Sequence, residues 1–313
     1  MRWGFAEVAL VVIGALGVAV ITAAVMGLAM RRDEPQSLQH ARRSSIWRAT
    51  VSIGVALVVL AIAVAVHIRF PWLEGVPFLL GPLAAAAAGL GTFALMPPPS
   101  IDGAVRRRTA DLAPRTLAQY SSITQRTTFV VIAVVTTVVV LVAGVSSKLS
   151  TDGRSICTSV FPAECPGGGP LLFPGWLFAA PALVLIAALG VATHYAVRRI
   201  IAAPRTAWPE LSAADTALRR SGVRLSLRIA GTALALTTAL FFGLAAFPLI
   251  NAQQLDTGLT TTEAVYAAMA GMILLGAAAF AFVYSIVATV LTVTSAFTAA
   301  RVPATASLEP ALQ

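Results

Sequence analysis

Side chains that could carry out catalysis or bind a metal are sparse in this chain and lie far apart. Its three histidines are His40, His67 and His194, and none belongs to a His-Glu-x-x-His pattern. Neither the nucleophile pattern Gly-x-Ser-x-Gly nor the phosphate-binding pattern Gly-x-x-x-x-Gly-Lys occurs. We therefore predict no catalytic residue, no metal site and no cofactor, and we do not expect an enzyme. An intramembrane enzyme would require a metal or cofactor in the purified protein.

One run of hydroxyl side chains has a spacing that places it on a single helix face. Ser285, Thr289, Thr292 and Ser295 recur at intervals of three or four residues, with Tyr284 adjacent. Such hydroxyls line a polar cavity or a hydrogen-bonded seam between helices. Alternatively, each bonds to a carbonyl of its own helix and has no further role. A polar cavity here would fit a permease.

The only two cysteines, Cys157 and Cys165, are eight residues apart, and the segment 166–170 that follows contains only Pro and Gly. Oxidising compartments favour disulfides, and so short a separation closes a small loop. We predict a disulfide between them, with two free thiols as the alternative.

Long uncharged segments make up most of the chain, in which 58% of residues are hydrophobic and 11% are charged. A soluble domain has about 25% charged residues. A helix crosses the ~30 Å hydrocarbon core of a bilayer with about 20 apolar residues, and it satisfies its own backbone polar groups. We predict an all-α polytopic transmembrane bundle that forms a single integral membrane domain over 1–313. Its seven spans are expected at about 8–30, 49–68, 76–97, 127–147, 173–197, 229–250 and 264–296.

The first span is expected to be a retained helix, because Arg31 and Arg32 follow its apolar run, whereas a cleaved signal has its basic residues in front. Small residues recur every fourth position in spans one and three, which predicts close helix packing within the bundle. They are Ala19, Ala23 and Gly27, and Gly81, Ala85 and Gly89.

Basic residues are distributed unequally between the two sides of these spans. The segments that follow spans one, three, five and seven carry 18 of the 22 Lys and Arg residues. Because positive charge marks the cytoplasmic side, the N-terminus is predicted outside and the C-terminus inside. The net charge of +9 does not indicate nucleic-acid binding, because the basic residues lie at span ends. We expect contact with the bilayer, with anionic lipid, or with a membrane or cytosolic protein, through Arg106, Arg107, Arg108, Arg219, Arg220 and Arg224.

The Arg-rich segments RRRTADLAPR (106–115) and DTALRR (215–220) resemble those of uncharacterised multi-pass membrane proteins of actinobacteria. The resemblance is one of style, carries no site residue, and implies a bacterial plasma-membrane location. The leading hypothesis is a non-enzymatic accessory or partner-binding membrane subunit. The alternative is a permease for a small neutral or apolar compound.

Overall fold

The computed structural model of the chain describes residues 36–97, 116–149, 157–159, 173–203, 212–251 and 259–298. Nearly all of them are helical. The predicted first span, 8–30, lies outside the described residues, as do Ala19, Ala23 and Gly27. The long helices are α2 (Gln36–Arg69), α3 (Val76–Leu95), α4 (Ile123–Val145), α5 (Trp176–Ala202), α6 (Ser212–Ile250) and α7 (Thr261–Thr298).

Two kinds of short element, 3-10 turns and strands, lie between these helices. Single 3-10 turns, η1 (Pro71–Leu73) and η2 (Leu117–Gln119), precede α3 and α4. The strands β1 (Ser147–Lys148) and β2 (Cys157–Thr158) pair antiparallel after α4. The turn from η1 into α3 uses the left-handed backbone region at Glu74 (φ 52°) and Gly75 (φ 86°). Glycine adopts that region without steric cost, so the chain reverses here within a few residues.

All six long helices are long and apolar enough to cross a membrane. The sequence-based prediction of an all-helical, multi-pass membrane protein is confirmed at this level. Two helices start well before the predicted spans, because a helix continues into water where residues such as Arg and Gln favour it. α2 begins at Gln36 rather than near residue 49, and α6 begins at Ser212 rather than near residue 229.

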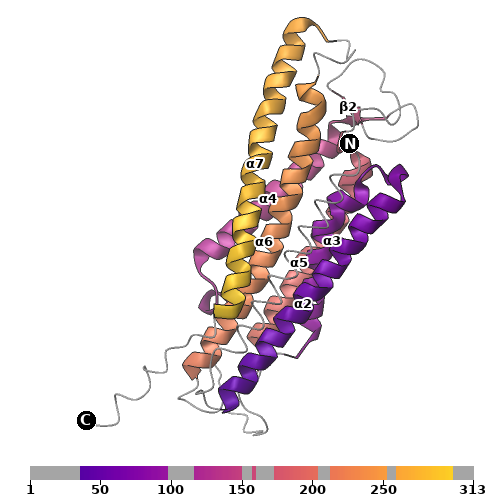
Figure 1. Cartoon of the computed structure of the whole chain (residues 1–313). Helices are drawn as coiled ribbons and strands as arrows, with labels where there is room; N and C mark the ends of the chain where they lie inside the picture. The colour runs from indigo at the N-terminus through magenta and orange to yellow at the C-terminus, as the bar shows by residue number, and fades with distance from the viewer. Residues whose placement is uncertain are drawn as a thin grey trace.

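Successive helices run in opposite directions, so the described helix ends gather at two ends of the bundle (Figure 1). We call one of them the arginine end, and we call the other, which carries β1 and β2, the strand end. The strand end has Arg69 and Lys148 as its described basic residues. The arginine end holds Arg42, Arg43, Arg48, Arg126, Arg198, Arg199, Arg219, Arg220, Arg224 and Arg228.

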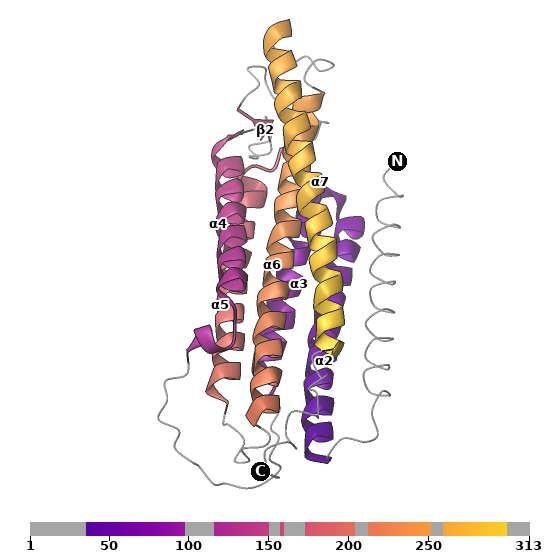
Figure 2. The same ribbon diagram turned by 90° about the vertical axis from the view of Figure 1, so that its left-hand side faces the viewer.

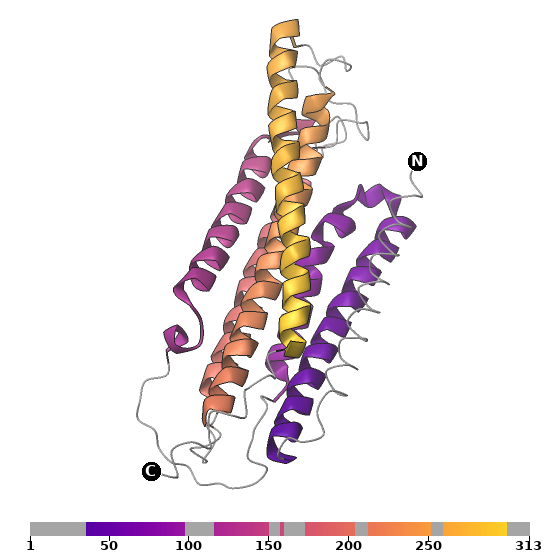
Figure 3. The same cartoon turned by 60° about the vertical axis from the view of Figure 1, so that its left-hand side comes forward.

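Helices α3, α4, α5 and α6 form the packed centre, while α2 lies on α3 and α7 lies on α6 (Figures 2 and 3). The centre is filled by large apolar side chains, among them Phe178 and Phe241, which are fully or almost fully buried. The predicted small-residue face of α3 packs against α2, which confirms packing within the bundle for this helix. A Cβ atom on Gly89 would lie 2.9 Å from the carbonyl oxygen of Ser52.

α7 is attached mainly through one face. Its Gly271 approaches the backbone of α6 so closely that a Cβ atom would lie 2.9 Å from the amide nitrogen of Ile250. The remaining faces expose large apolar side chains, of which Phe280 is 78% exposed and Ile273 72%. Such a surface is compatible with lipid or with another helix, and it is incompatible with water.

Candidate functional site

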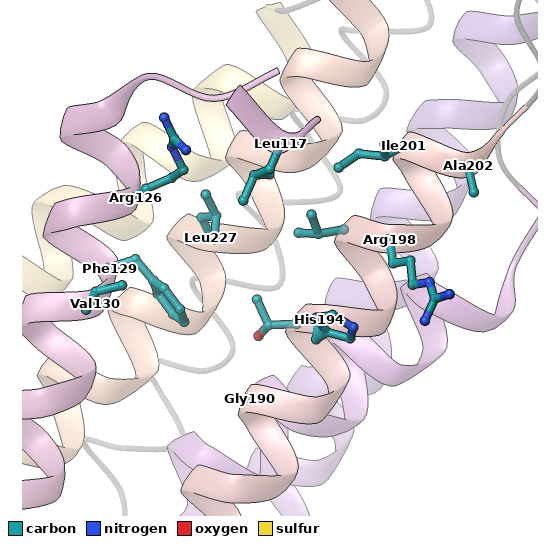
Figure 4. A pocket seen from close by; sticks show the side chains of 12 residues that line it. Leu117, Arg126, Phe129, Val130, Gly190, His194, Arg198, Ile201, Ala202 and Leu227 are labelled. Atoms are coloured by element: carbon teal, nitrogen blue, oxygen red, sulfur yellow. The ribbon is translucent and has the colours of Figure 1, made fainter. Parts of the chain in front are cut away.

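Helix α4 is packed tightly at one end and loosely at the other. At the strand end, Gly144 lies against the ring of Trp176, whose nearest atom would be 3.1 Å from a Cβ at Gly144. Val140 and Ala143 are buried with Phe178 in the same cluster. Toward the arginine end, α4 and α5 leave a lateral opening of about 660 Å³ (Figure 4). We call it the α4–α5 groove.

The walls of the α4–α5 groove are mostly apolar. They include Phe129 and Val130 of α4, Val197 and Ile201 of α5, and Leu227 of α6. The hydroxyl of Thr193 also lines the groove, but it donates to the carbonyl of Leu189 at 2.7 Å and its hydrogen is therefore engaged.

Three side chains that can carry positive charge stand around this apolar wall. Arg126 belongs to α4, whereas His194 and Arg198 belong to α5 (Figure 4). His194 and Arg198 are exposed. The Nε atom of Arg126 is enclosed, yet it has no hydrogen-bond partner among the described residues. An enclosed N–H group without a partner is costly, so Arg126 gains no stabilising hydrogen bond from its Nε within the described residues.

A second, smaller pocket of about 140 Å³ lies on the other side of α4, between α4, α6 and α7. It shares Phe129 and Leu227 with the α4–α5 groove. Its polar lining consists of Thr124, Gln125, Thr128, Arg224, Arg228 and Tyr284. We call it the Tyr284 pocket.

The predicted hydroxyl stripe reaches this pocket only in part. Tyr284 lines it, but the Ser285 hydroxyl donates to the carbonyl of Phe282 at 2.7 Å. The Thr289 hydroxyl donates to the carbonyl of Ser285 at 2.7 Å. Both hydroxyls therefore bond within their own helix. The side chains of Thr292 and Ser295 lie outside the description.

The hydroxyl seam between helices is found elsewhere, in a place that sequence analysis missed. The hydroxyls of Thr136 in α4 and Thr238 in α6 lie 2.8 Å apart, and both side chains are buried. The Thr136 hydroxyl also lies 3.3 Å from the carbonyl oxygen of Leu234. The only sequence signal was a pair of adjacent threonines in each span, at 136–137 and 237–238.

The predicted arginine contacts divide into two groups. Arg219 is buried, and its Nε lies 3.0 Å from the Asp215 carboxylate. Its Nη1 donates to the carbonyl of Ala203, at 2.7 Å, where α5 ends. A cation at a helix C-terminus bonds carbonyls that have no partner within the helix. Arg219 thus joins the end of α5 to α6.

The other predicted arginines differ in position. Arg220 is exposed and its Nε lies 3.3 Å from the carbonyl oxygen of Gln119 in η2. Arg224 is exposed at the Tyr284 pocket. Arg106, Arg107 and Arg108 lie outside the described residues.

Arg48 is a structural residue that sequence analysis did not identify. It is 3% exposed, and its Nε and Nη2 donate to the carbonyl of Phe93 at 2.9 and 2.6 Å. Its guanidinium carbon lies 4.0 Å from the centroid of the Phe93 ring, which adds a cation–π contact. The available signal was its position directly before an uncharged span.

The remaining candidates lie apart from the grooves. His67 is at the strand end, whereas His194 is at the arginine end, so the two do not share a site. Among the described residues, no group of three His, Cys, Asp or Glu side chains converges. Cys165 and the side chain of Cys157 lie outside the description, and the disulfide stays a prediction.

Comparison of the chain with protein-family models, curated proteins and solved structures finds no match.

Proposed function

We propose that this protein is a seven-span bacterial plasma-membrane protein with its N-terminus outside and its C-terminus inside. In this proposal it performs no enzymatic reaction and acts as an accessory subunit that binds a protein partner. The orientation is supported by the concentration of basic residues at the arginine end, which the positive-inside rule places in the cytoplasm.

The observation that carries the partner proposal is the length of exposed apolar surface on α7. Arg228 of α6 donates to the carbonyl of Leu291 at 3.1 Å, so Leu291 lies level with the basic residues that mark the inner interface. A hydrocarbon core of ~30 Å extends about 20 helical residues from that level, to roughly residue 271. The turns 261–270 then lie beyond the core.

These projecting turns are apolar as well as exposed. Gly271 abuts Ile250, the last residue of α6, so 261–270 extends about 15 Å past α6 (Figure 1). Tyr266 is 67% exposed there and Met269 58%. Lipid tails do not reach this level, and water is a poor solvent for such side chains. Another protein that covers this segment resolves the conflict.

Site-specific photo-crosslinking in native membranes tests this proposal. A photoreactive residue at Tyr266 is expected to give one protein adduct of defined mass. The matched control is Val134 of α4, which is 56% exposed within the hydrocarbon region and should give lipid adducts only. The double variant Tyr266→Ser, Met269→Ser should lose co-purification of the same protein while it is expressed at a normal level. Lipid adducts alone from both positions would refute the proposal.

A permease is the second candidate, and the Tyr284 pocket is the observation that favours it. Its volume of about 140 Å³ is below the ~300–1,000 Å³ of typical ligand pockets, so only a very small solute fits. Since Ser285 and Thr289 bond within α7, the discriminating variant is Tyr284→Phe, which removes one hydroxyl from the pocket. Uptake of small neutral solutes into proteoliposomes should fall in this variant and stay unchanged in Ser285→Ala. Absence of uptake by the wild-type protein would dismiss the permease.

A further inference from the structure

The shape of the α4–α5 groove suits one extended apolar chain. Its lining on α5 runs from Gly190 to Ala202, which is about 18 Å along the helix axis. The groove is open rather than an enclosed cavity, and Figure 4 shows that its apolar side chains lie between α4 and α5. A flexible hydrocarbon chain that enters from the bilayer would therefore lie parallel to α5 and contact side chains such as Val197 and Ile201.

The positive charge around the groove favours the binding of an anion at its arginine end. Asp215 is the one acidic residue that the described part of the chain places at this end, and it is bonded to Arg219. The described acids Glu74 and Glu263 lie at the strand end. Arg126 and Arg198 consequently have no acidic partner among the described residues. The Nε of Arg126 is enclosed and has no hydrogen-bond partner among the described residues, and the residue belongs to the groove lining.

The depth of these arginines matches that of lipid phosphates. Arg126 immediately precedes the predicted span 127–147, and Arg198 immediately follows the predicted span 173–197. Arginines at span ends extend their charged heads toward the interface while their stems remain among apolar groups. We infer that the α4–α5 groove binds an anionic phospholipid, whose headgroup is held by the positive charges of Arg126 on one side of the groove and Arg198 on the other, and whose acyl chain lies along the apolar wall.

This site is separate from the projecting turns of α7, so the test of lipid binding does not depend on the proposed protein partner. A free phosphate shares the chemistry of the lipid headgroup, but it would leave the long apolar wall unused. The inference therefore commits to a lipid, and free phosphate is an outcome that the experiment must separate.

Native mass spectrometry of the full chain, purified in detergent and stripped of lipid, tests the inference. The protein is titrated with dioleoyl phosphatidylglycerol, which is anionic, or with dioleoyl phosphatidylcholine, which is zwitterionic. We expect the first phosphatidylglycerol to bind about tenfold more tightly, because charge-assisted hydrogen bonds to phosphate strengthen binding by roughly that factor. Millimolar inorganic phosphate should not displace it.

Two kinds of variant separate the headgroup from the chain. Arg126→Gln and Arg198→Gln should each weaken phosphatidylglycerol binding by about tenfold and leave phosphatidylcholine unchanged. The matched control is Arg43→Gln, an exposed arginine of α2 at the same end. Gly190→Leu should weaken both lipids, because the glycine faces open space within the groove. Its control is Gly276→Leu, which faces open space on α7.

Circular dichroism and size-exclusion chromatography establish that each variant is folded. If one arginine variant does not fold, the other is compared with the Arg43→Gln control. Equal affinity of the wild-type protein for the two lipids would overturn the inference. The inference would also be overturned if Gly190→Leu and both arginine variants bound the two lipids with the same affinities as their controls. Displacement of the lipid by inorganic phosphate, with no effect of Gly190→Leu, would show a small-anion site and overturn the commitment to a lipid.

Discussion

Two helix pairs of this bundle meet the arginine end in opposite ways. In the pair α2–α3, Arg48 fills the space between the helices and donates two hydrogen bonds to the Phe93 carbonyl. In the pair α4–α5, the helices separate, and Arg126 faces a groove of about 660 Å³. An arginine that bonds the end of a neighbouring helix stabilises the bundle. An arginine without such a partner is available to a ligand.

Among the arginines that bond the end of a neighbouring helix, Arg219 is expected to show the largest loss of stability when it is replaced, in Arg219→Ala. The substitution leaves Asp215, which is 8% exposed, without its counter-charge and removes the bond to the Ala203 carbonyl. Breaking a buried ion pair by removing one partner costs about 3–5 kcal/mol. Denaturant unfolding in detergent measures this loss. The control is Arg220→Ala at the neighbouring position, where removal of an exposed side chain should lower the free energy of unfolding by less than ~1 kcal/mol. Equal losses would contradict a structural role for Arg219.

Arg48→Ala should follow with a loss of about 2–3 kcal/mol. It removes two charge-assisted hydrogen bonds and leaves the Phe93 carbonyl unpaired in a buried place. The same unfolding measurement applies, with Arg43→Ala on the exposed side of α2 as the control. Arg48→Lys should recover part of the loss, because one ammonium donor can still reach the carbonyl. If Arg48→Ala and Arg43→Ala unfold alike, α2–α3 is closed by something other than this arginine.

The packing of the two pairs is compared by one substitution made at two glycines. Gly89→Ala places a Cβ 2.9 Å from the Ser52 carbonyl oxygen, and because this is backbone, α2 has to move. Overpacking of this kind costs about 1–3 kcal/mol. Gly190→Ala meets nothing within 4 Å and should stabilise its helix by up to ~1 kcal/mol. Thermal unfolding that shifts in the same direction for both variants would show that the groove is not open in the protein.

The sequence was sufficient to predict the helices, but it was insufficient to predict that the α2–α3 and α4–α5 pairs use their arginines differently. Uncharged runs of about 20 residues predict spans because the bilayer imposes that length on any crossing helix. The four-residue spacing of Gly81, Ala85 and Gly89 predicted close packing within the bundle, and α3 indeed packs this way on α2. Both predictions depend on local spacing, which the sequence displays directly.

The partners of the arginines could not be predicted, because they depend on which helices are neighbours. Arg48 and Phe93 are 45 positions apart, and Arg219 meets carbonyls 16 and 19 positions before it. The same holds for Thr136 and Thr238, which are 102 positions apart. Hydroxyls at regular spacing on α7 suggested a cavity, but Ser285 and Thr289 bond to carbonyls of their own helix, an alternative that spacing cannot distinguish.

The smallest expected effect on stability is that of Arg126→Gln, in the α4–α5 pair. Arg126→Gln removes a guanidinium whose Nε has no hydrogen-bond partner among the described residues. Because no described bond is lost, the free energy of unfolding in a non-ionic detergent should change by less than ~0.5 kcal/mol. The same measurement with added phosphatidylglycerol should show a gap between wild type and variant, since a ligand that binds only the folded state stabilises it. A loss as large as that of Arg48→Ala in lipid-free detergent would show that Arg126 has a structural role, and the two helix pairs would then use their arginines alike.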